Sequence, residues 1–151
     1  MARGGARNRS GPQPVEGSRD SDRKGFSLTA LPPAGYDGEA PDFPLPQLLE
    51  RERELWDWAW TTPQAAAWSG EPWRWYSIAM WVRTAVICEG LEATAADKGS
   101  LHRFADQIGM TPAGLKENGW KIAEAPKAAA PAATEDEDDP RLRLVRDGSG
   151  G

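Results

Sequence analysis

The feature that most constrains this fold is an unusually apolar segment in the middle of the chain. Between Ile78 and Cys88, nine of the eleven residues are apolar. A helix that is apolar nearly all round must be covered nearly all round. The pattern therefore predicts a buried central helix from Trp73 to about Gly90. In a chain of 151 residues, either a second copy or the chain's own remaining segments must supply that cover.

An earlier segment, which follows Pro46 and ends near Pro63, predicts the first helix of the body. Its apolar residues recur at helical spacing on one stripe, but Trp58 lies on the opposite side of the helix. An exposed tryptophan predicts contact with another copy, or cover by the Pro-rich segment that precedes the helix. The residues that we expect at an interface between copies are Trp56, Trp58, Trp60, Trp75, Ile78, Trp81 and Val82.

Two further helices are predicted by start signals. Thr94 with Asp97 three residues later resembles a capping box, and the apolar positions from Leu101 to Ile108 follow the helical period. After Gly109, Thr111 is a good N-cap and is followed by proline. The spacing fits a helix-turn-helix and a plain helical hairpin equally well. We therefore expect an all-α domain of four to five helices at about 46–122.

The regions on either side of this body have a different composition. Residues 1–45 are rich in Gly, Pro, Ser and charge, which predicts a disordered arm that continues into a Pro-rich strap. The strap's apolar residues are expected to dock on a helical body or on a neighbouring subunit, and a plain linker is the alternative. These residues are Phe26, Leu28, Leu31, Tyr36 and Phe43. Residues 123–151 combine an Ala/Pro linker, an acidic run at 135–139 and an Arg/Leu block at 141–146. We expect this tail to be disordered, or its last block to dock as a strand on a partner.

Net charge and the absence of reactive groups point to a binder and not to an enzyme. The formal charge is −5, and any affinity for DNA must come from local patches such as the arginines of the arm. A single cysteine, Cys88, rules out an internal disulfide and a multi-cysteine zinc site, and the single histidine has no second ligand at metal-binding spacing. The sequence has no Gly-rich loop ending in Gly-Lys-Ser/Thr. We therefore expect no catalytic residues, no metal, no cofactor and no small-molecule substrate.

The longest strongly apolar stretch, Trp75 to Cys88, is shorter than the roughly 20 residues that span a bilayer, and Arg83 interrupts it. The N-terminus lacks an apolar segment of signal-peptide length. We therefore expect neither a membrane span nor secretion.

Several stretches, taken in order, resemble the small terminase subunits of tailed bacteriophages that infect actinobacteria. They cover most of residues 7–122, and the most telling are residues 54–56, 60–68 and 101–112, followed by Leu115 and Trp120-Lys121-Ile122. The resemblance implies a ring-shaped homo-oligomer in the host cytoplasm that recognises double-stranded viral DNA. It implies that a large terminase subunit, which carries the ATPase and nuclease, receives this DNA. The chain departs from many of these proteins because its N-terminus is an arm and not a clear DNA-binding domain.

Local charge and sequence pattern, taken together with the resemblance, suggest roles for particular residues. The Arg/Leu block is the candidate docking segment for the large subunit: Arg141, Leu142, Arg143, Leu144, Val145 and Arg146. DNA contacts are expected from the arm, with two lysines on the last helical segment as further candidates: Arg3, Arg7, Arg9, Arg19, Arg23, Lys24, Lys116 and Lys121. Two other functions stay open. One is a helical protein–protein adaptor that binds no DNA, and the other is a helix-turn-helix transcription regulator that forms dimers.

Overall fold

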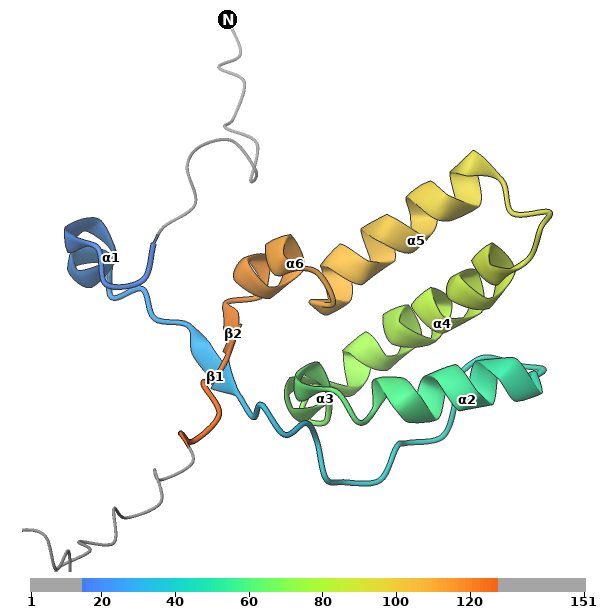
Figure 1. Ribbon diagram of the computed structural model, residues 1–151, viewed down its shortest axis with the longest axis horizontal. Coiled ribbons are helices and arrows are strands. Elements are labelled where there is room, and N and C mark those ends of the chain that lie inside the picture. The colour runs from blue at the N-terminus through green and yellow to red at the C-terminus, as the bar shows by residue number, and fades with distance from the viewer. Residues whose placement is uncertain (1–14, 128–151) are drawn as a thin grey trace, which may run out of the picture.

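The computed structural model describes residues 15–127, and its main feature is a row of three long helices. Helix α4 (Trp75–Glu89) lies between α2 (Glu50–Ala59) and α5 (Ala95–Ile108) (Figure 1). Adjacent helices run in opposite directions. Arg51 near the start of α2 pairs with Glu89 at the end of α4, and Arg74 just before α4 donates to the Gln107 carbonyl near the end of α5. The predicted all-α fold is confirmed.

Shorter helices connect and flank this row. They are α1 (Arg19–Lys24), α3 (Pro63–Trp68), the 3-10 turn η1 (Pro72–Arg74) and α6 (Pro112–Glu117). The predicted starts of α5 and α6 are confirmed in detail. The Thr94 side chain accepts a hydrogen bond from the Asp97 backbone N–H, and the Asp97 carboxylate accepts one from the Thr94 backbone N–H. Helix α6 begins with proline after the N-cap Thr111.

A short parallel pair of strands joins the two ends of the described chain. Strand β1 (Thr29–Leu31) pairs with β2 (Trp120–Ile122). The sequence analysis placed Lys121 on the last helical segment, and this prediction is wrong. Helix α6 ends earlier because Gly119 takes a left-handed conformation (φ 75°), which favours glycine. Its carbonyl then accepts a hydrogen bond from the Thr29 N–H at 2.8 Å, which aligns the two strands.

The Pro-rich strap is part of the packed body and not a linker. Leu31 and Leu45 are buried, and the Phe43 ring meets Trp56 edge-on at 5.1 Å between centroids. The Trp56 indole N–H also donates to the carbonyl of Pro41. The folded body therefore begins near residue 29, about 17 residues before the boundary expected from composition.

The central helix α4 receives its cover from segments of the same chain. The strap, α2 and α5 together bury Ile78, Ala79 and Val82 completely. Trp56 and Trp60 are also buried within one chain. Four of the seven residues predicted at an interface between copies therefore cannot contact a second copy, because the strap and the flanking helices already cover them. These residues are Trp56, Trp60, Ile78 and Val82.

A buried ion pair explains why an acid interrupts the apolar stripe of α2. The Glu52 side chain is only 2% exposed and receives hydrogen bonds from Arg83 of α4 at 2.6 and 3.0 Å. Arg83 also donates to the carbonyls of Pro46 and Gln47 in the strap. The hydrogen bond from Arg83 is the main cause that lowers the pKa of Glu52. The pair thus ties α2, α4 and the strap together.

Candidate nucleic-acid interface

The turn between α5 and α6 is the segment that would act as a helix-turn-helix reader. Gly109 ends α5 in a left-handed conformation (φ 82°), and a Cβ there would lie 2.6 Å from the Trp120 ring. Thr111 then accepts a hydrogen bond from the Gly114 N–H at 2.9 Å and donates one to Asp106 of α5. Cap, glycine and ring packing fix the angle between the two helices.

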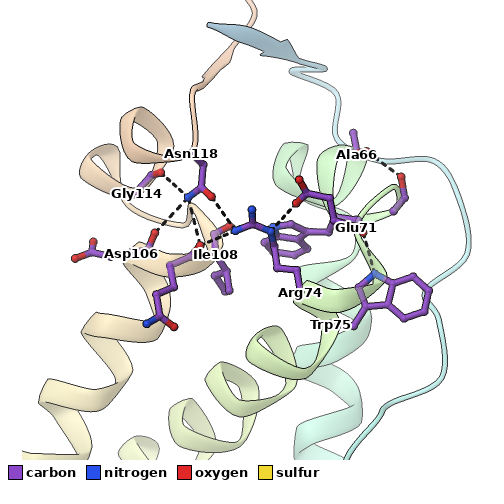
Figure 2. Close-up of polar contacts among 11 residues, drawn as sticks. Ala66, Glu71, Arg74, Trp75, Asp106, Ile108, Gly114 and Asn118 are labelled. Atoms are coloured by element: carbon purple, nitrogen blue, oxygen red, sulfur yellow. Dashed lines mark hydrogen bonds and ion pairs between the residues drawn. The ribbon is translucent and has the colours of Figure 1, made fainter. Parts of the chain in front are cut away.

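Arg74 of η1 connects this turn to the rest of the body through hydrogen bonds. Its guanidinium donates to the Gln107 carbonyl at 2.7 Å, to Asn118 Oδ1 at 2.8 Å and to the Glu71 carboxylate at 2.6 Å (Figure 2). It also lies over the rings of Trp73 and Trp120, at 4.6 and 4.9 Å from their centroids. Arg74 is only 8% exposed. It therefore holds the structure together and is not displayed to a phosphate.

A cavity of about 360 Å³ lies beside Arg74. Its walls are Trp73, Arg74, Ser77, Asp106, Gln107, Glu117 and Asn118. The two carboxylates give the cavity an acidic lining, while the one guanidinium is already bonded to protein acceptors. Such a lining repels a phosphate. The cavity is therefore not where DNA would bind.

The outer surface of the α5–α6 hairpin carries cations that the sequence analysis did not single out. Lys98 and Arg103 are exposed on α5, beside exposed His102, and the predicted Lys116 is exposed on α6. The sequence does indicate that these residues are on the surface, because Lys98 and Arg103 do not occupy the apolar positions of α5. These side chains can reach phosphates, as can any exposed Lys or Arg.

The arm candidates are only partly covered by the structure. Arg19 and Arg23 are exposed on α1, in a segment that was expected to be a mobile arm. Asp20 and Asp22 separate Arg19 from Arg23 in the sequence of this helix. Lys24 is its last residue. Arg3, Arg7 and Arg9 lie outside the described residues, as does the docking candidate 141–146.

Lys121 has a partner within the chain. Its ammonium pairs with the Glu16 carboxylate at 2.7 Å, and the hydrogen bond from Lys121 is the main cause that lowers the pKa of Glu16. The pair links β2 to the segment before α1. Lys121 is consequently a weaker candidate for phosphate contact than Lys116.

The remaining interface candidates are tryptophans that keep some exposure. Trp58 on α2 is 51% exposed and leans against Trp81 of α4, with 6.5 Å between ring centroids. Trp75 and Trp81 are partly buried. Trp75 faces inward, since its indole N–H donates to the Trp68 carbonyl at 2.8 Å. Trp58 and Trp81 thus retain surface that a partner can cover.

Within residues 15–127, no group of three or more His, Cys, Asp and Glu side chains is placed to hold a metal ion. The same part of the chain contains no helix long and apolar enough to cross a membrane. His102 is exposed on α5 and Cys88 is partly buried near the end of α4. Comparison with known proteins adds no identification, because no protein-family model, curated protein or solved structure matches the chain.

Proposed function

We propose that this chain is a non-catalytic DNA-recognition subunit of a viral packaging machine, the small terminase subunit of a tailed bacteriophage. The observation that carries the proposal is the α5–α6 hairpin. The stretch that most resembles that family, residues 101–112, spans most of α5, the turn and the start of α6. The turn's cap and glycine support a rigid reading element, and exposed cations line its outer surface.

The acidic body makes multivalency necessary for this function. Between residues 15 and 127 there are seventeen acidic residues and twelve Lys or Arg residues, so a single copy would bind DNA weakly. Assembly into a ring repeats each weak phosphate contact and raises the overall affinity. The arm arginines Arg3, Arg7 and Arg9 and the hairpin cation Lys116 are the proposed contacts. The DNA would then pass to the large subunit. The proposed segment of this chain that docks on the large subunit is 141–146.

The first experiment is a titration of the full chain with a duplex from the viral packaging start and with a random duplex, at several salt concentrations. A variant with Arg3, Arg7 and Arg9 changed to Gln should bind more weakly. In a plot of log affinity against log salt concentration, the slope should become less negative by about 0.9 for each phosphate that the arm no longer neutralises. The matched control changes one exposed cation away from the arm, Lys127→Gln, and should leave both quantities nearly unchanged. An unaltered affinity and slope in the triple variant would remove the arm from the interface.

A protein–protein adaptor is the second candidate, favoured by exposed aromatic side chains. Trp58, Trp73 and Tyr76 are each more than half exposed, and aromatic residues are enriched where proteins meet. The same titration separates the two functions, because an adaptor binds neither duplex. The transcription-regulator alternative would use the same α5–α6 hairpin to read DNA, so the titration does not separate it from the packaging function. It predicts dimers, however, which light scattering distinguishes from rings.

A further inference from the structure

An apolar stripe along α4 is left uncovered by the described part of the chain. Trp73, Tyr76 and Met80 are spaced by three and four residues, which places them on one side of the helix and the turn before it. Trp73 is 71% exposed and Tyr76 is 59% exposed, while Met80 is partly buried. Exposed aromatic side chains grouped in this way are typical of an interaction surface.

The cavity beside Arg74 continues this stripe at the N-terminal end of α4. Trp73 belongs to both, since it lines the cavity together with Ser77 of α4. Figure 2 shows three further walls, Arg74 of η1, Asp106 of α5 and Asn118 at the end of α6. An apolar stripe therefore leads directly into a polar cavity.

The charge of the cavity favours a cation. The positive charge of Arg74 is balanced by Glu71, which pairs with it at 2.6 Å. Asp106 and Glu117 then leave an excess of negative charge, and Lys116 is not among the walls. The last turn of α5 also lines the cavity, and the C-terminal end of a helix attracts cations. The surface thus suits a segment with apolar side chains followed by a cation.

Only one segment outside the described residues has this composition. Residues 141–146 contain two leucines, one valine and three arginines. Residues 1–14 contain three arginines but no leucine, isoleucine, valine or aromatic residue, and residues 128–140 contain no cation. Charge and apolar character therefore both select the Arg/Leu block as the occupant.

We propose that the Arg/Leu block, residues 141–146, binds the stripe and the cavity of its own chain. In an extended segment, alternate side chains lie on the same side. The side that faces α4 carries two leucines and then an arginine. The register is Leu142 on Met80, Leu144 on Tyr76 and Arg146 in the cavity.

The spacing of the stripe fits this register. Side chains two positions apart in an extended chain are separated by about 6.6 Å. Met80 and Tyr76, four positions apart on α4, are separated by about 6 Å along the helix axis. Trp73 lies a further three positions toward the cavity, or roughly 4.5 Å along the same axis. The block would therefore run opposite to α4.

The chain leaves the body close to the cavity. Trp120 of β2 lies under the Arg74 guanidinium, 4.9 Å from the ring centroid, and β2 ends at Ile122. Residues 123–140 can span at most roughly 60 Å, which is ample for a return to the cavity. A tether of this kind raises the effective concentration of the block to the millimolar range.

The acids that flank the block do not oppose this register. Asp147 follows Arg146 directly but lies on the other side of an extended segment. The acidic run 135–139 ends seven positions before Arg146. That separation is about 23 Å in an extended chain, well beyond the screening length of about 8 Å.

The proposal rests on the proposed function in one respect. The same block is the proposed docking segment for the large subunit, so its contact with α4 would cover the leucines until the large subunit displaces them. The contact itself requires neither DNA nor the large subunit.

The test measures how a fluorescein-labelled peptide of residues 138–149 binds to full-length chains, by fluorescence anisotropy. In the unaltered chain the tethered block already occupies the surface, so the peptide should bind weakly. The double variant Leu144→Ser with Arg146→Glu releases the block. This released-block chain should bind the peptide about tenfold more tightly, because the peptide no longer competes with a tether at millimolar effective concentration.

Two matched controls locate the contact. Arg143→Glu makes the same charge change on the other side of the block, and this chain should bind the peptide as weakly as the unaltered chain does. Adding Tyr76→Ser and Glu117→Lys, both at exposed positions, to the released-block chain alters the stripe and the cavity and should abolish peptide binding. Circular dichroism melting verifies that every variant is folded.

Three results would each overturn the proposed contact. They are equal peptide binding by the unaltered and released-block chains, an equal gain in Arg143→Glu, and binding that survives the changes at Tyr76 and Glu117. Occlusion that disappears when the unaltered chain is diluted would also overturn it, because the occupant would then be the block of a neighbouring copy. The DNA titration is a separate measurement. DNA binding without the tenfold gain would reject only this contact, and the gain without DNA binding would reject only the packaging function.

Discussion

The tryptophan cluster and the α5–α6 hairpin are stabilised by contacts of very different range along the chain. The Trp60 ring is the centre of the cluster, and its centroid lies 5.6 to 6.0 Å from those of Tyr36, Trp56, Trp68 and Trp75. It brings together the strap, α2, α3 and α4. The helix starts of the hairpin instead depend on caps between residues a few positions apart, while bonds from Arg74 and Trp68 attach the hairpin to the body. The caps form locally, whereas the cluster forms only when the whole domain is folded.

The largest expected effect is on the cluster, in the variant Trp68→Ala. Trp68 is fully buried and meets Trp60 edge-on, and its indole N–H donates to the Ile108 carbonyl at 2.9 Å. Removing the ring leaves a cavity and an unpaired carbonyl, so the free energy of unfolding should fall by about 3–5 kcal/mol. Urea denaturation measures this loss. The control Trp73→Ala, at a position 71% exposed, should cost about 1 kcal/mol or less. Equal losses in the two variants would mean that the cluster does not dominate stability.

The second effect concerns the ion pair that fastens the strap. Glu52→Gln leaves the Arg83 charge without its partner, so the free energy of unfolding should fall by about 2–4 kcal/mol. The control Glu54→Gln breaks an exposed ion pair with Arg51 and should cost less than about 1 kcal/mol. Thermal melting of both variants gives the comparison. A Glu54 variant that loses as much as the Glu52 variant would contradict the role given to burial.

The same pair predicts how stability depends on pH. Because Arg83 lowers the pKa of Glu52 in the folded chain, the unfolded chain binds a proton at this site more readily. The stabilisation is therefore fully present above the unfolded-state pKa of about 4.3 and is lost as the pH falls through the lower folded-state pKa. Urea denaturation at several acidic pH values should show a shallower decline in Glu52→Gln than in the unaltered chain. Identical declines would indicate that Glu52 does not titrate in this way.

The contrast in range also explains what could be predicted from the sequence. Thr94 with Asp97, and Gly109 with Thr111, are signals confined to a few residues, so the starts of α5 and α6 were predicted correctly. The pairing of β1 with β2 joins residues about ninety positions apart, and a segment as short as Trp120–Ile122 has no alternating pattern long enough to be typical of a strand. Periodicity reports which residues are apolar but not which segment covers them.

For the same reason, the buried tryptophans were assigned to the wrong partner. Trp56 and Trp60 required cover, and the sequence analysis placed them among the residues at an interface between copies, although it also expected the strap to dock on a helical body. In the structure the strap needs no core of its own, since Phe43 and Tyr36 insert against rings that α2 already presents. Of the candidate site, exposed Lys116 was identified. Lys98 and Arg103 were missed because their spacing marks them only as surface residues and does not distinguish them from other exposed cations.

The smallest effect is expected at the hairpin cap, in Thr111→Ala. Thr111 accepts the hydrogen bond from the Gly114 N–H, and loss of an N-cap costs about 1 kcal/mol. Hydrogen exchange of the Gly114 amide should become faster, while the amides around Trp68 should keep their protection, because the cap acts within one turn of α6. Thr111→Ser retains the hydroxyl and should restore most of the protection. If Thr111→Ala instead lowered protection in the cluster as much as at Gly114, the hairpin and the cluster would form one cooperative unit, and the distinction between local and long-range stabilisation would no longer hold.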